Sequence, residues 1–157
     1  MPNAIFILRE YPRSDYAARV LRQRARAFLA ALDLDGVELS ITLLDDEAIA
    51  ALNKQWRKKD TPTDVLSFPA GDMPPIPGEP RPLGDVVISL DTARRRAVEE
   101  GMSLASELSR YLAHGLLHLL GHDHHTPEEA RAMSRAEEAL LEGLGQGMLL
   151  GSPETEV

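Results

Sequence analysis

All five histidines of this 157-residue chain lie between His114 and His125, in the stretch HGLLHLLGHDHH. Histidine is a common metal ligand and binds through a neutral imidazole nitrogen. His114 and His118 are four residues apart, so on a helix their side chains project from one face, one turn apart. Gly121 offers an end to that helix, because glycine adopts the left-handed conformation at little cost. The spacing H-x-x-x-H-x-x-G-x-x-H therefore predicts a three-histidine metal site.

His124 is the favoured third ligand, because it lies six residues after His118, as in the metzincin zinc motif H-E-x-x-H-x-x-G-x-x-H. His122 and His125 are the alternatives. Three histidines with an open fourth position are the ligand set of a catalytic zinc ion, which lowers the pKa of its bound water toward 7. A solvated histidine-rich tract is the competing interpretation. It does not explain two histidines at helical spacing within the apolar run Leu112–Leu120.

Gly115 stands where the zinc proteases have the glutamate that serves as general base. A protease mechanism therefore lacks its base at the expected place. Asp123, beside the favoured third ligand, and Asp85, at the start of a predicted strand, are the candidates for a base or for a group that orients a ligand imidazole. A strand cap is the alternative role for Asp85. A cationic helper would suit a phosphate substrate, because an arginine guanidinium forks onto phosphate oxygens.

The composition is that of a soluble globular protein, with 43% hydrophobic and 27% charged residues. The absence of cysteine excludes a disulfide framework and a thiolate metal site, and it fits a reducing cytosol. We therefore expect a cytoplasmic protein, without a membrane span or a secretory signal. The net charge of −8 speaks against a non-specific polyanion binder. Residues 101–157 hold nine acidic and three basic side chains, which would suit a basic partner.

Apolar periodicity predicts one α+β domain over residues 1–150 and a frayed tail over 151–157. Residues 70–84 contain five prolines and are expected to form an irregular surface loop. Ser14, Ser103 and Thr126 are the expected helix N-caps. The four expected strands are Ala4–Leu8, Val37–Leu44, Asp64–Phe68 and Asp85–Ser89. The five expected helices span about 15–32, 46–56, 90–100, 104–120 and 127–144.

Other polar and aromatic residues have simple structural interpretations. Trp56, the only tryptophan, is expected in the core or in an interface rather than as a platform for stacking bases. Thr63, Asp64 and Ser67 are as well explained by a structural role at a strand edge as by contact with a substrate. Arg94–Arg96 is most simply the solvated face of a helix.

Three sequence blocks resemble the YbeY family, bacterial ribosomal-RNA maturation factors regarded as metal-dependent endoribonucleases. The blocks are LNKQWRKKDTPTDVLSFP at 52–69, LGDVVISLDTARRRA at 83–97 and HGLLHLLGHDHHTPEEARAM at 114–133. They follow the family's order and together cover about a third of the chain. The resemblance implies a small α+β domain with a mixed, mostly parallel sheet, and a metal site after a helix C-terminus. The family commonly has tyrosine where this chain has His122, so His122 and His125 remain competitors for the metal.

By this resemblance one zinc ion per chain is bound by His114, His118 and His124, and Arg57 is the catalytic arginine. Lys58 and Lys59 beside it are expected to add salt-sensitive contacts to the substrate. The implied substrate is single-stranded RNA.

The implied role is maturation of the 3′ end of the small-subunit ribosomal RNA and ribosome quality control. The implied partners are the small ribosomal subunit, a ribosomal protein and a ribosome-assembly GTPase. The alternatives are a zinc hydrolase for peptides or small molecules, and a ribosome assembly or adaptor factor with a mainly structural zinc ion.

Overall fold

Four strands form one mixed sheet in the computed structural model, which describes residues 2–57, 63–71, 74 and 76–148. The strand order across the sheet is β1-β2-β4-β3. Strands β1, β2 and β4 are parallel, and β3 runs antiparallel to β4. The predicted mixed, mostly parallel sheet is thereby confirmed. The bounds are β1 Ala4–Arg9, β2 Val37–Leu44, β3 Val65–Pro69 and β4 Arg81–Ser89.

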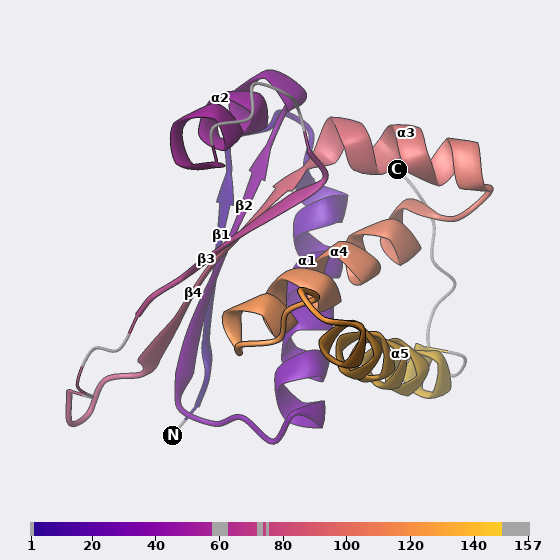
Figure 1. The fold of residues 1–157 in the computed structure, drawn as a ribbon. Helices are drawn as coiled ribbons and strands as arrows, with labels where there is room; N and C mark the ends of the chain where they lie inside the picture. The colour runs from indigo at the N-terminus through magenta and orange to yellow at the C-terminus, as the bar shows by residue number, and fades with distance from the viewer. Residues whose placement is uncertain (1, 58–62, 72–73, 75, 149–157) are drawn as a thin grey trace.

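The described residues form five helices that pack around this sheet, as expected for an α+β domain (Figure 1). Helices α1, α4 and α5 lie together on one side, and α2 lies on the other side at one end of the sheet. No helix among the described residues combines the length and apolar character needed to cross a bilayer. The predicted tail over 151–157 lies outside the described residues. The bounds are α1 Asp15–Ala31, α2 Asp46–Arg57, α3 Leu90–Glu100, α4 Leu104–Leu119 and α5 Pro127–Met148.

The two faces of the sheet are buried to different extents. The side chains of Leu39, Ile41 and Leu43 in β2 are fully buried in the large core beneath α1 and α4. On the other face, a small cluster beneath α2 buries only a few apolar side chains. Phe6 and Leu8 of β1 are consequently 52% and 51% exposed. One face therefore supplies most of the stabilising burial, and the other is partly open to solvent.

Two of the three predicted N-caps form their capping bonds. Ser103 and Thr126 each accept a hydrogen bond from the backbone N–H three residues later, at 3.0 and 3.1 Å. Ser14 precedes α1 as expected, but its side chain makes no capping bond. Its hydroxyl instead accepts from Arg9 and donates to the carbonyl of Tyr11. The sequence thus predicts where the helix starts, but not the hydrogen bonds that the Ser14 hydroxyl makes.

The prediction of an irregular loop over 70–84 is wrong at its C-terminal end. Strand β4 begins at Arg81 and includes Pro82. The ladder between β3 and β4 ends at the pair Pro69–Gly84, so this first part of β4 is paired with β2 alone. Proline is tolerated on such an edge segment, because no neighbouring strand needs its missing N–H.

Helix α4 approaches the sheet closely at Gly115. A Cβ atom added there would lie 2.7 Å from Cγ1 of Val86 and 3.2 Å from Oγ of Ser67. The Ser67 hydroxyl also donates to the Gly115 carbonyl at 3.1 Å. Glycine therefore allows the histidine-bearing helix to lie against β3 and β4. The glutamate that zinc proteases carry at this position would have no room here.

Replacing Gly115 by alanine is expected to lower the free energy of unfolding by about 1 kcal/mol. Overpacking against Val86 costs about 1–3 kcal/mol, and the higher helix propensity of alanine returns about 1 kcal/mol. The matched control is Gly143→Ala in α5, where an added Cβ meets no atom within 4 Å and only the propensity gain remains. Denaturant unfolding compares the two variants. A Gly115→Ala protein as stable as Gly143→Ala would contradict the close contact.

Candidate metal centre

His114 and His118 project from one face of α4, as their spacing predicts. Their Nε2 atoms are 3.1 Å apart. Two nitrogens bound to one tetrahedral zinc ion at about 2.0–2.1 Å are separated by about 3.3 Å. The two imidazoles are therefore spaced to bind the same ion with little adjustment.

Glu137 of α5 contacts the opposite side of the His114 ring. Its Oε1 lies 2.5 Å from Nδ1 of His114. A carboxylate at this distance keeps the proton on Nδ1 and leaves the Nε2 lone pair available, which is the tautomer that binds a metal through Nε2. The sequence does not predict this contact, because Glu137 lies 23 residues from His114 on another helix and no local spacing points to it.

The turn at Gly121 brings the loop histidines back toward α4. Gly121 has a φ of 99°, and its N–H donates to the carbonyl of His118 at 3.0 Å. After this turn the ring centroid of His124 lies 5.3 Å from that of His118 and 6.2 Å from that of His114. The structure thus places His124 beside both helical imidazoles.

Asp123 shares this location. A possible metal site is formed by His118, Asp123 and His124, because one ligand atom from each residue lies within 4.8 Å of the other two. His114 falls outside this group, although its Nε2 is close to that of His118. Oδ1 of Asp123 accepts a hydrogen bond from the His124 backbone N–H at 2.8 Å. The possible donors are therefore three imidazoles and one carboxylate.

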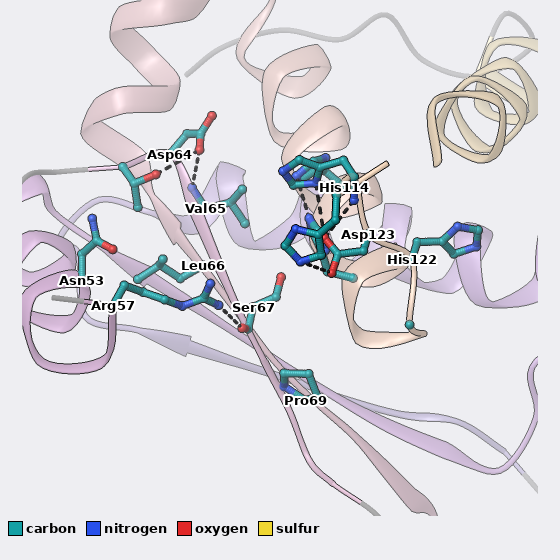
Figure 2. A pocket seen from close by; sticks show the side chains of 15 residues that line it. Asn53, Arg57, Asp64, Val65, Leu66, Ser67, Pro69, His114, His122 and Asp123 are labelled. Atoms are coloured by element: carbon teal, nitrogen blue, oxygen red, sulfur yellow. Dashed lines mark hydrogen bonds and ion pairs between the residues drawn. The ribbon is translucent and has the colours of Figure 1, made fainter. Parts of the chain in front are cut away.

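His122 and His125 are placed less favourably for the same ion. The His122 side chain points away from the other labelled imidazole and from Asp123 (Figure 2). The Nε2 atom of His125 lies 2.9 Å from Oδ2 of Asp123, and its side chain is 81% exposed. This geometry favours His124 as the third histidine.

The protonation states of the cluster suit metal binding. Burial, assisted by the neighbouring His114, lowers the pKa of His118 below its usual range, although a backbone hydrogen bond with His122 acts in the opposite direction. The hydrogen bond from the His124 backbone lowers the pKa of Asp123. At neutral pH we therefore expect a neutral His118 and an ionised Asp123, the forms in which these groups bind a metal.

The imidazoles line one side of a cleft of about 740 Å³, which β3 and the end of α2 also line (Figure 2). Arg57, the last residue of α2, lies in this second part of the cleft. Its Nη2 donates to the carbonyl of Ser67 at 2.9 Å, which fixes the guanidinium at the β3 edge. The structure thus brings Arg57 and the histidines into one cleft, as the resemblance implies. Lys58 and Lys59 lie outside the described residues.

Asp85 lies away from the imidazoles, so its predicted role as a base or orienting group is wrong. Val86 contacts Gly115 of α4, and successive side chains of a strand point to opposite faces of the sheet. Asp85 therefore faces the side of α2, where it lines a separate hollow with Trp56 and Phe68. Glu137 occupies the orienting position for which the sequence offers Asp85 and Asp123 as candidates.

The structure narrows two further expectations. Trp56 is 61% exposed, so of its two expected locations the core is excluded and an interface remains. Arg96 is not only a solvated side chain, since its Nη1 lies 2.9 Å from Oδ2 of Asp64 and connects α3 to the start of β3. Asp64 also lines the cleft. Its role in the described residues is structural, because its other carboxylate oxygen accepts from the Val65 backbone at 2.8 Å.

The fold and the site together define a class: a small α+β protein with a histidine-rich candidate metal centre beside an arginine in an open cleft. This donor set, without sulfur and with a solvent-accessible cleft, is typical of catalytic rather than structural zinc sites.

Comparison with known proteins narrows this class. Residues 10–145 match the family model described as Endoribonuclease YbeY. A Myxococcus xanthus relative described as Endoribonuclease YbeY is 64% identical over 124 residues, which are 79% of this chain and 42% of the relative. An Anaeromyxobacter relative of the same description is 56% identical over 147 residues, 92% of this chain and 75% of the relative. The chain therefore belongs to the endoribonuclease YbeY family, whose activity is cleavage of phosphodiester bonds in RNA.

A solved structure is similar in fold. The solution structure of TM1509 from Thermotoga maritima matches with a TM-score of 0.58 and 23% sequence identity, covering 98% of this chain and 99% of that one. At this identity the likeness supports the arrangement of helices and strands alone. The chain spans less than half the length of the Myxococcus relative, so the match to that relative concerns one part of a longer protein.

Proposed function

We propose that this protein is a zinc-dependent endoribonuclease that cleaves single-stranded RNA, with His114, His118 and His124 as the zinc ligands. One observation carries the proposal: the Nε2 atoms of His114 and His118 converge to 3.1 Å within a cleft that also contains Arg57. A metal site and an arginine in one cleft suit a phosphodiester, because its phosphate needs both charge neutralisation and orientation.

The donor set fits one zinc ion. Glu137 holds the tautomer of His114, burial keeps His118 neutral, and the exposed ring of His124 can turn toward both. A zinc ion bound by three imidazoles supplies a Lewis acid and lowers the pKa of water toward 7. The ionised carboxylate of Asp123, close to His118 and His124, is the group that we propose to accept a proton during the reaction.

Arg57 is the proposed catalytic residue that binds the scissile phosphate. The guanidinium has five N–H donors, and within the described part of the chain its one hydrogen bond runs from Nη2 to Ser67. The remaining donors are available to phosphate oxygens in the cleft. Lys58 and Lys59, next to it in the sequence, would add charge that attracts the RNA backbone without reading its sequence.

Two alternative functions fit the site less well. A peptidase would need a base near the first histidine, and the contact of Gly115 with Val86 leaves no space for a glutamate. An assembly factor with a structural zinc ion would be expected to have a closed site of four ligands. Here the third histidine is 60% exposed and the cleft is open.

The biological role that we propose is cytoplasmic maturation of the 3′ end of small-subunit ribosomal RNA, and ribosome quality control. Family membership supports this role. The proposed partners are the small ribosomal subunit, a ribosomal protein and a ribosome-assembly GTPase. The acidic residues of the C-terminal third offer a complementary surface for a basic ribosomal protein.

The test of this function is a cleavage assay on protein purified without an affinity tag and analysed for metal. Zinc-loaded protein is expected to cut a single-stranded RNA, to spare the same sequence in a perfect duplex, and to lose activity when a chelator removes the metal. Readdition of zinc should restore cleavage. Cleavage that persists without metal would indicate a contaminating ribonuclease, and its absence with zinc bound would contradict the proposed activity.

A further inference from the structure

The sheet face opposite α4 carries a row of side chains that α2 leaves uncovered. Leu66 and Val87 are buried under α2, but the neighbouring register positions are not. The strand register places one residue of each strand side by side in this row: Phe6, Ser40, Asp85 and Phe68. The row thus has aromatic rings on both edge strands and a carboxylate near its centre.

Trp56 extends this row from the end of α2. Its ring meets that of Phe68 edge to face, with centroids 6.3 Å apart and planes at 71°. Between them lies a hollow of about 430 Å³, which we call the Asp85 hollow; it is lined by Thr42, Leu52, Trp56, Phe68, Asp85 and Val87. Trp56 is 61% exposed, so one face of its ring is available to a ligand.

Asp85 is the one charged residue among the described residues that line this largely apolar hollow. Within the described part of the chain, no hydrogen-bond donor or cation contacts its carboxylate. Partial burial raises its pKa, because loss of water disfavours the charged carboxylate. A ligand that supplies N–H donors would remove that cost.

The Asp85 hollow and the metal-binding cleft lie on opposite sides of the edge strand β3. Ser67 lines the cleft, and Phe68, the next residue, lines the hollow on the other face. Arg57 contacts both sides, because its Nη2 bonds to the Ser67 carbonyl while its Cζ lies 5.9 Å from the centre of the Phe68 ring. A strand of RNA with a phosphate on Arg57 would therefore place a neighbouring base beside Phe68 and Trp56.

We propose that the Asp85 hollow binds one nucleobase of the RNA, stacked on Trp56, and selects bases that carry an amino group through Asp85. Aromatic side chains on an open four-stranded sheet are suited to stacking unpaired bases. A carboxylate accepts from the amino group of cytosine, whereas the carbonyl oxygens of uracil would face it unfavourably. This inference rests on the proposed function for the choice of RNA over a peptide, since the cleft is what places a phosphate on Arg57.

Binding of short oligoribonucleotides to metal-free protein tests the proposal without cleavage. Trp56 is the only tryptophan, so quenching of its fluorescence reports stacking directly. Wild-type protein is expected to bind oligocytidine about tenfold more tightly than oligouridine of the same length. Asp85→Asn keeps the shape but adds an N–H donor, so the preference should fall to about twofold or less.

Fluorescence anisotropy of a labelled oligocytidine extends the test to variants without tryptophan. Trp56→Ala should weaken binding at least about fivefold, the lower limit for loss of one stacked base. The matched control is Val98→Ala on α3, which removes another exposed apolar side chain, 82% exposed, and should bind as wild type does. Because Asp85 and Trp56 are both exposed, unchanged circular dichroism should show that the variants fold.

The outcomes separate this inference from the proposed function. Unchanged tryptophan fluorescence at saturating RNA would overturn the nucleobase site. So would an equal preference for oligocytidine in wild type and Asp85→Asn. The site would also be overturned if the hollow binds a protein segment and the affinity for RNA is the same in wild type and Trp56→Ala. If the base preference holds but zinc-loaded protein does not cleave, the site stands and the nuclease function fails. If cleavage occurs without any base preference, the nuclease function stands and the nucleobase site fails.

Discussion

Replacing His118 by alanine is expected to abolish zinc binding and RNA cleavage together. His118 lies closest to the other possible donors: its Nε2 is 3.1 Å from that of His114, and it shares a group with Asp123 and His124. Without it the remaining imidazoles are on different elements and no longer converge. We expect zinc affinity to fall by more than about 100-fold, beyond the range seen when only an orienting group is lost. Competition with a chelator of known affinity measures the change.

Two variants calibrate that measurement. Glu137→Gln keeps every imidazole but removes the negative charge at Nδ1 of His114, so a loss of about 10- to 100-fold in zinc affinity is expected. His122→Ala should retain wild-type affinity, because that side chain points away from the cluster. If His122→Ala loses zinc and His124→Ala does not, the assignment of the third ligand is wrong.

The parts of the site that follow local spacing could be predicted from sequence. Two histidines four residues apart must share a helix face, and Gly121 ends the helix because a positive φ there favours glycine. The same periodicity located the helices and strands to within one residue, apart from the end of α5 and the start of β4. The start of β4 could not be predicted, because the cost of Pro82 depends on whether β3 reaches that far.

Long-range placement could not be predicted in the same way. Glu137 reaches His114 only because α5 packs beside α4, and no spacing in the sequence encodes that contact. Asp85 was assigned to the wrong face, because alternation along β4 leaves open which set of side chains meets α4. The close contact of Gly115 with Val86 decides it. For Trp56, expected in the core or in an interface, the core is excluded because α2 covers only one end of its sheet face and leaves the ring exposed.

Replacing Arg57 by alanine is expected to lower the cleavage rate about 100- to 1,000-fold, with zinc content unchanged. This is the effect of removing one group that stabilises charge in a transition state. Arg57 is exposed at the end of α2, so its loss should alter stability by less than about 0.5 kcal/mol. Arg57→Lys should give an intermediate rate, since one ammonium cannot reproduce the fork that reaches both the Ser67 carbonyl and a phosphate.

Arg19→Ala is the matched control for this prediction. Arg19 is also an exposed arginine, with its Cζ 5.8 Å from the centre of an aromatic ring, that of Tyr16, but it lies on α1 and does not line the cleft. Its loss makes the net charge equally more negative, so any general weakening of RNA attraction appears in both variants. Single-turnover cleavage at saturating RNA compares them. If both variants cleave equally fast with zinc bound, Arg57 does not act on the phosphate and the chemistry rests on the metal centre alone.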